Sequence, residues 1–141
     1  MTKTLTTLIK LNKNKLDKIL KEVELREIEK KRLFDKKNMM QNELNAEIEK
    51  FSSTEFSFML EKYVEKSNKM IKTLDAQMMQ QERIIDALRQ TIKEQFAELK
   101  KFEIAYNNRK IIENDKDKKA NDKIMDENNI NKFFYNKNSD L

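Results

Sequence analysis

The sequence predicts an all-α protein, a long antiparallel two-helix coiled-coil hairpin with a disordered C-terminal tail. The first observation behind this prediction is that the 141 residues include no Gly and no Pro, the residues that most often interrupt helices. The second is a sustained heptad repeat in the second half of the chain. The charged fraction of 39% and the hydrophobic fraction of 38% would also suit a disordered chain, so the periodicity decides.

The clearest heptad repeat lies between Leu60 and Tyr106. Eleven of its fourteen positions are apolar, compared with 38% of the whole chain, and its polar residues occur in only one of the two alternating sets of positions. A period of 3.5 residues held for this length between charged neighbours is typical of a coiled coil. The fourteen positions are Leu60, Val64, Ser67, Ile71, Leu74, Met78, Gln81, Ile85, Leu88, Ile92, Gln95, Leu99, Phe102 and Tyr106.

The first half of the chain carries a less regular repeat. Apolar residues recur every seven positions at first, but the next ones follow ten or eleven positions later, which predicts a skip in the register near Leu33 or Phe34. We therefore expect a helix over about residues 6–50 with one local irregularity. The apolar residues assigned to this seam are Ile9, Leu16, Ile19, Leu20, Val23, Leu33 or Phe34, Leu44, Ile48 and Phe51.

A cluster of Ser and Thr separates the two repeats and predicts the turn. Ser52 and Glu55 have the spacing of a capping box, and an apolar run follows them. We expect a turn at residues 52–54, a second helix over about residues 55–127 and a disordered, Asn-rich tail at residues 128–141. The hairpin domain would then span residues 1–127, and facing residues would have numbers that add up to about 105. One continuous helix that dimerises through the seam is the alternative.

The composition excludes several kinds of chemistry. The chain has no His, no Cys and no Gly, so it has no imidazole base, no thiolate, no zinc site of nitrogen and sulfur ligands and no Gly-rich phosphate loop. We expect no catalytic, cofactor-binding or metal-binding residues, and no enzymatic activity. Glu22, Glu24, Glu27 and Glu29 are expected to pair with nearby lysines such as Lys18, Lys30 and Lys31 rather than to hold a cation.

Nothing in the sequence predicts a membrane segment or a targeting segment. The first ten residues lack the apolar core of a signal peptide, and no apolar run approaches the roughly 20 residues that cross a bilayer. We therefore expect a soluble, cytoplasmic protein without direct membrane insertion.

The net charge of +5 is unevenly distributed along the chain. Residues 1–20 hold five Lys and one Asp, and residues 100–141 hold ten basic and eight acidic side chains. In a hairpin these segments meet at the open end, which would be electropositive and suited to an acidic partner, while the turn end would be close to neutral. Nucleic acid is not expected as a partner, because the lysines alternate with acids. The cluster Phe133-Phe134-Tyr135 fits a short peptide ligand and a chance grouping equally well.

Two stretches of the chain resemble the flagellar FliJ family. The first runs from Gln95 to Ala105 and contains a leucine, a basic pair, an aromatic residue and a glutamate, followed by Arg109 and later by an Asp-Glu pair at residues 126–127. The second is the start of the chain, from Lys3 to Asp17. The resemblance covers nearly the whole of residues 1–127.

The resemblance implies a non-enzymatic, cytoplasmic component of the flagellar type III protein export apparatus, peripheral to the export gate at the inner membrane. Members of the family are antiparallel two-helix coiled coils similar to the central stalk of rotary ATPases. They associate with the export ATPase hexamer, contact the cytoplasmic domain of the export gate and interact with substrate chaperones. We expect the open end to dock into the ATPase ring and promote export. The candidate partner-binding residues are Lys10, Lys100, Lys101, Phe102, Arg109 and Lys110.

The sequence leaves other functions open. The chain could instead be the equivalent stalk protein of a virulence type III secretion system. Only the block at residues 99–104 distinguishes the flagellar assignment from this one. A homodimeric coiled-coil scaffold is the alternative from another class, and its mass in solution would distinguish it from a monomeric stalk. In either stalk, the turn end around residues 56–63 would remain available for a second contact.

Overall fold

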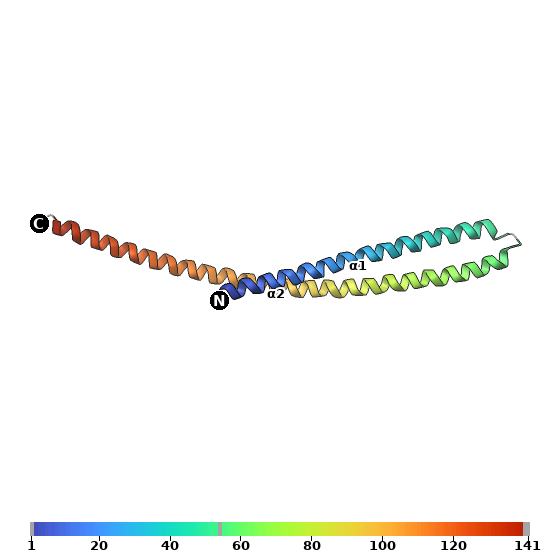
Figure 1. Cartoon of the computed structure of the whole chain (residues 1–141), viewed down its shortest axis with the longest axis horizontal. Coiled ribbons are helices and arrows are strands. Elements are labelled where there is room, and N and C mark those ends of the chain that lie inside the picture. The colour runs from blue at the N-terminus through green and yellow to red at the C-terminus, as the bar shows by residue number, and fades with distance from the viewer. Residues whose placement is uncertain (1, 54, 140–141) are drawn as a thin grey trace. The chain divides into compact units, whose positions relative to one another are not determined.

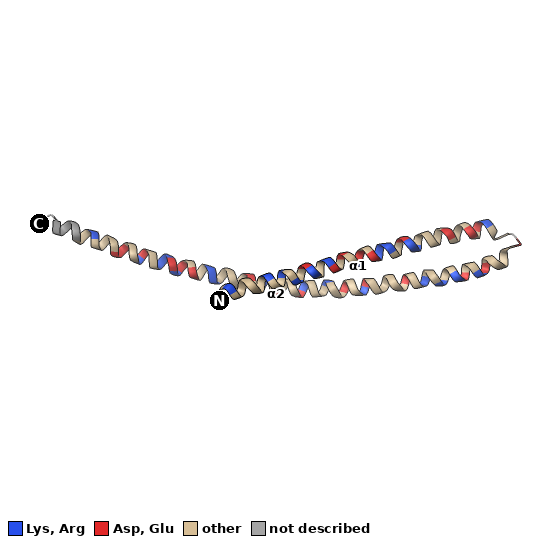
Figure 2. Ribbon diagram, in the orientation of Figure 1, with Lys and Arg blue, Asp and Glu red and all other residues tan. Residues whose placement is uncertain are grey.

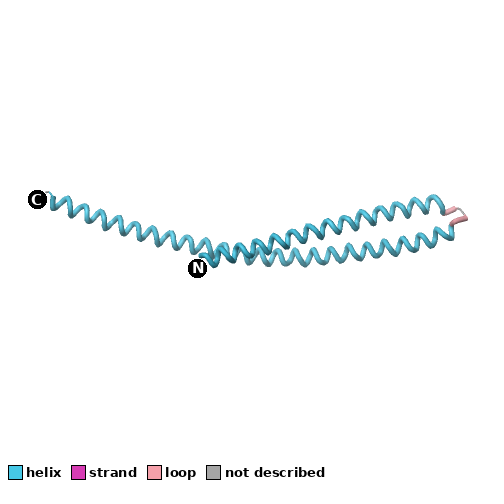
Figure 3. Tube along the Cα trace, viewed as in Figure 1, coloured by secondary structure: helices cyan, strands magenta, loops and turns pink. Residues whose placement is uncertain are grey.

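The computed structural model describes residues 2–53 and 55–139, with side chains as far as Phe134. It contains two α-helices, α1 (Thr2–Phe51) and α2 (Ser57–Ser139), which pack antiparallel as a hairpin (Figure 1). Figure 3 shows that the connection between them is the loop at the turn. The described residues form two compact units, residues 14–96 and residues 2–13 with 97–139. The predicted all-α coiled-coil hairpin is therefore confirmed.

The heptad repeat predicted for the second helix is confirmed in full. All fourteen positions from Leu60 to Tyr106 are buried or half-buried. Within residues 14–96, the core contains Ile71, Leu74 and the completely buried Ile85 on α2. Ser67 is also buried, so the polar residues predicted for this seam do face the partner helix.

The register skip predicted in the first helix is wrong. A strict heptad repeat runs through α1 without interruption, and each of its positions is buried or half-buried. Leu20, Phe34 and Ile48, which the sequence assigned to the seam, are 48%, 50% and 37% exposed and stand beside it. The fifteen seam positions are Thr2, Leu5, Ile9, Asn12, Leu16, Ile19, Val23, Arg26, Lys30, Leu33, Lys37, Met40, Leu44, Glu47 and Phe51.

The apolar pattern of α1 breaks because charged side chains occupy seam positions. Lys and Arg can lay an aliphatic stem along an apolar surface while the charged group reaches its edge. Lys37 Nζ lies 2.7 Å from the Asp75 carboxylate of α2, and Lys30 pairs with Glu82. These residues therefore continue the seam, although a hydrophobicity pattern cannot detect them.

The turn is longer than the sequence predicts. α2 begins at Ser57 and not at Glu55, so the capping-box pair lies in the connection and does not form the first turn of the helix. The rings of Phe51 and Phe56 pack edge to face across the connection, with centroids 6.3 Å apart. Because the connection extends to Phe56, cross-helix pairs lie further along α2 than expected, since the numbers of Arg26 and Gln81 add up to 107 and those of Lys37 and Asp75 to 112.

The unit of residues 2–13 and 97–139 pairs the first turns of α1 with the middle of α2. Leu5 and Leu99 are buried in it, as is the polar Asn12. The Thr2 hydroxyl donates a 2.9 Å hydrogen bond to the Glu113 carboxylate. Facing numbers that add up to about 105 would place Thr2 opposite residue 103, but its hydroxyl contacts Glu113, so the facing positions lie further along α2.

The helical backbone of α2 continues past the predicted boundary at Asn128 and ends at Ser139. Every described side chain from Lys110 to Phe134 is exposed, and beyond Glu113, which accepts the hydrogen bond from Thr2, no described residue of α1 packs against the helix. Helices without tertiary packing are marginally stable in water. Disorder of the tail therefore stays a prediction, and residues 140–141 lie outside the described residues. Among the described helices, none is long and apolar enough to cross a bilayer.

Candidate functional site

The six candidate partner-binding residues belong to one compact unit. Lys10 lies on α1 and the other five lie on α2, all within residues 2–13 and 97–139. Residues 2–13 and 97–113 hold seven basic and three acidic side chains, and residues 2–13 hold no acid at all. Figure 2 shows the Lys and Arg residues along both helices. The paired part of this unit is therefore electropositive, and we call it the basic end.

The candidates differ in how accessible they are. Lys10, Lys100 and Lys101 are exposed, so their ammonium groups are on the surface. Phe102 and Arg109 are half-buried at seam positions of α2, which gives them a packing role. The three lysines are exposed to a partner, whereas substitutions of the two seam residues would change the packing of the hairpin.

A shallow groove of about 320 Å³ lies on the basic end. Tyr106 lines it, and Lys110 Nζ lies 5.9 Å from the centroid of the Tyr106 ring, a cation–π distance. Lys13 and Glu103 add one charge of each sign to its lining. An aromatic ring beside exposed ammonium groups suits a partner surface that presents carboxylates around an apolar side chain. The groove is lined by Thr6, Ile9, Lys13, Glu103, Tyr106 and Asn107.

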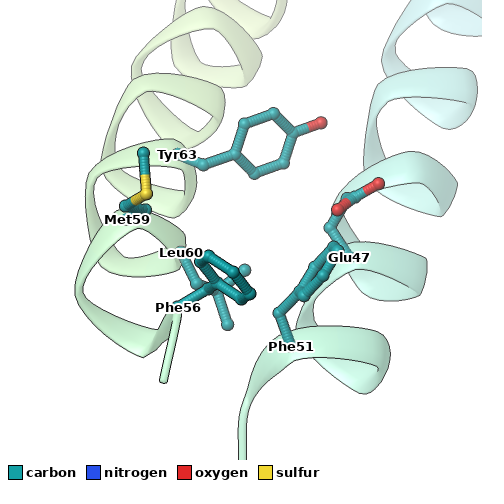
Figure 4. A pocket seen from close by; sticks show the side chains of 6 residues that line it. All are labelled: Glu47, Phe51, Phe56, Met59, Leu60 and Tyr63. Atoms are coloured by element: carbon teal, nitrogen blue, oxygen red, sulfur yellow. The ribbon is translucent and has the colours of Figure 1, made fainter. Parts of the chain in front are cut away.

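A second groove, of about 410 Å³, lies next to the turn, within residues 14–96. Figure 4 shows side chains of α1 facing those of α2 across it. Its rim carries exposed apolar groups, since Phe56 is 50%, Met59 68% and Tyr63 40% exposed, and Phe58 nearby is 66% exposed. The groove is lined by Glu47, Phe51, Phe56, Met59, Leu60 and Tyr63, and we call it the turn groove.

The region of the turn groove is acidic, contrary to the expectation of a nearly neutral turn end. Residues 43–65 hold six Glu and two Lys. The expectation averaged the charge over longer segments, in which lysines further from the turn cancel these glutamates. The basic end is therefore rich in Lys, whereas the turn region is rich in Glu.

Three of the four glutamates in residues 22–29, namely Glu22, Glu27 and Glu29, form ion pairs. Glu27 lies 2.9 Å from Arg89, and Glu22 lies 3.5 Å from Arg26. A hydrogen bond from Arg32 lowers the pKa of Glu29 below its ordinary value. Within the described part of the chain, no three acidic side chains are grouped to hold a metal ion. The pairing partners are arginines, and not the nearby lysines that the sequence suggested.

Comparison of the chain with protein-family models, with curated proteins and with solved structures finds no match in any of the three. The geometry of the hairpin, its charge distribution and the resemblance of two sequence blocks to one family are the features that bear on function.

Proposed function

We propose that the chain is a non-enzymatic stalk of a flagellar type III export apparatus, which binds the ring of the export ATPase through its basic end. Three features support the proposal. The fold is a two-helix antiparallel coiled coil, the form of the family that the sequence resembles. The blocks that carry the resemblance include residues of the basic end. The sequence contains no His and no Cys, two of the side chains that most often act in acid–base and nucleophilic catalysis, and this composition suits a protein without catalysis.

The observation that carries the proposal is the composition of the basic end. It joins the start of α1 to residues 97–113 of α2 in one unit with seven basic and three acidic side chains. Exposed lysines on a narrow two-helix end suit insertion among acidic side chains of a ring-shaped partner. The electrostatic attraction would raise the association rate and would weaken as salt increases.

Binding of this kind promotes export without chemistry on this chain. A stalk that contacts several subunits at once stabilises the assembled ring, because it binds the ring and not the separated subunits. Nucleotide turnover in the ring then rises in the presence of the stalk. The turn groove, with its exposed aromatic side chains, would provide the second contact, toward the export gate or a substrate chaperone.

The experiment measures the ATPase rate of a candidate flagellar export ATPase with the full chain at near-physiological salt. The test variant is Lys100→Glu with Lys101→Glu, which reverses two exposed charges at the basic end. The matched control is Lys118→Glu with Lys119→Glu, an adjacent exposed pair further along α2. We expect the wild-type chain and the control to stimulate the ATPase, and the test variant to lose at least about tenfold in apparent affinity.

Two results would count against the proposal. Stimulation that survives the reversal at Lys100 and Lys101 would reject docking through the basic end. Neither binding nor stimulation by the wild-type chain would reject the ATPase as partner, and a dimeric mass would then favour the homodimeric scaffold. Stimulation of a virulence-system ATPase in preference to the flagellar one would assign the chain to that system.

A further inference from the structure

Three cations stand in the apolar seam of α1. Arg26, Lys30 and Lys37 occupy consecutive or nearly consecutive seam positions, and their side chains are 35%, 38% and 31% exposed. The seam positions around them are apolar, and Leu33 between them is buried. Half-buried cations in a coiled-coil seam stabilise the fold less than apolar side chains of similar size. Their presence therefore calls for a reason other than stability.

Each cation meets a polar side chain of α2. Arg26 donates a 3.3 Å hydrogen bond to the Gln81 amide oxygen. Lys30 pairs with Glu82. The hydrogen bond between them raises the pKa of Lys30 and lowers the pKa of Glu82, which favours the charged form of both side chains. Lys37 Nζ lies 2.7 Å from Asp75.

The two acids of α2 stand at equivalent places beside its seam. Asp75 and Glu82 each come four residues after a seam position and seven residues from one another. The α2 helix thus presents an acidic flank, spaced by one heptad, opposite a basic seam. One heptad further along, the same flank of α2 carries the cation Arg89, and the sign is reversed, because Arg89 pairs with Glu27 of α1 at 2.9 Å.

On α1, the acid Glu27 stands at the equivalent flank position one heptad earlier, but the flank positions that follow Lys30 and Lys37 carry no acid. Phe34 and Gln41 stand four residues after Lys30 and Lys37, at the positions equivalent to the two acids of α2. If two copies of α1 paired in parallel register, each seam cation would face the same cation of the other copy. Like charges in a seam disfavour such a pair. Two copies of α2 would in turn leave their acidic flanks without a basic seam.

We propose that Arg26, Lys30 and Lys37 form a pairing code, which favours packing of α1 against α2 and prevents copies of the protein from associating through two α1 helices. This inference is independent of the partner proposed above. It predicts that the wild-type chain is a monomer of 17.0 kDa in solution. It also predicts that a more hydrophobic seam makes the protein less specific in its pairing.

Sedimentation equilibrium of full-length chains tests the proposal. The seam variant carries Arg26→Leu, Lys30→Leu and Lys37→Leu. The control variant carries the same type and number of changes at exposed positions of the same helix, Lys21→Leu, Lys31→Leu and Lys36→Leu. We expect the wild type and the control to remain monomeric, and the seam variant to associate at least about tenfold more tightly than the control.

A charge exchange provides a second test that does not add apolar surface. Lys30→Glu with Lys37→Glu places carboxylates against Glu82 and Asp75 and should lower the melting temperature. Adding Glu82→Lys and Asp75→Lys to the same chain should restore it, because the pairs form again with reversed sign. If the seam variant does not fold, this second test decides between the two outcomes.

The proposal is overturned by any of three results. The wild-type chain could be a dimer at low concentration, or the folded seam variant could remain as monomeric as the control. The third is that the variant with all four charge substitutions melts at as low a temperature as the variant with only Lys30→Glu and Lys37→Glu. In each case the three cations would be solvated side chains without influence on pairing.

Discussion

Ile85 should be the residue whose truncation weakens the hairpin most. Its side chain is 0% exposed, the only described side chain that is completely buried. Ile85→Ala removes three carbon atoms, which corresponds to about 2.4 kcal/mol of transfer free energy at about 0.8 kcal/mol each. The cavity that remains raises the expected loss of unfolding free energy to about 3 kcal/mol.

Ile28 provides a control with the same chemistry. It lies near the middle of α1 and is 59% exposed, so the transfer loss is about 1 kcal/mol. Alanine favours a helix over isoleucine by about 0.4 kcal/mol, which leaves a net loss of about 0.5 kcal/mol for Ile28→Ala.

Urea unfolding followed by circular dichroism at 222 nm measures both variants. The expected outcome is a much larger fall in the urea midpoint for the Ile85 variant than for the Ile28 variant, with unchanged slopes. Equal losses for the two variants, or a loss below about 1 kcal/mol for Ile85→Ala, would refute the assignment of Ile85 to the core of the seam.

Two further predictions concern charge and the unpaired helix. Lys30 lowers the pKa of Glu82, so this pair contributes stability above the ordinary carboxyl pKa of 4.5 and loses that contribution as the pH falls through the folded pKa. A urea series across acid pH should therefore show a smaller decline for Glu82→Gln than for the wild type, and an identical decline would contradict it. In hydrogen exchange, amides of residues 114–134 should exchange at least about 100-fold faster than those of residues 64–99, because nothing packs against them; equal protection would contradict the predicted disorder beyond Asn128.

The second helix could be predicted from its sequence because its seam is made of apolar residues. Val64, Ile71 and Ile85 stand at regular places in a repeat without a slip, and polar residues interrupt only one of its two sets of positions. Hydrophobic burial alone determines which side of this helix faces its partner. The pattern and the structure therefore agree position by position.

The first helix could not be predicted to the same extent, because its seam is amphipathic. Lys30 and Lys37 are hydrophilic by any scale, yet their aliphatic stems fill seam positions and their ammonium groups reach acids of α2. Only the identity of the opposite residues reveals this, and those depend on the register of the hairpin. The apolar Phe34 next to Leu33 then led to the incorrect skip.

The charge of the basic end could be predicted from the sequence, whereas the shape of the turn groove could not. The excess of lysine at residues 1–20 indicated a basic end before the fold was known. The turn groove depends on how far the connection extends, since that decides whether Phe51 and Tyr63 line the same space. Three of the eight phenylalanines fall within residues 51–58, and this local density of aromatic side chains was the only feature of the sequence that indicated the turn groove.

A crosslinking experiment tests directly whether the basic end, and not the turn end, contacts the export ATPase. The chain has no cysteine, so a single cysteine can carry a crosslinker at one chosen position. Lys101→Cys places it on the basic end and Ser53→Cys places it at the turn, and both positions are exposed. With the ATPase hexamer present, we expect crosslinking from residue 101 and none from residue 53. Crosslinking from residue 53 alone would contradict this expectation.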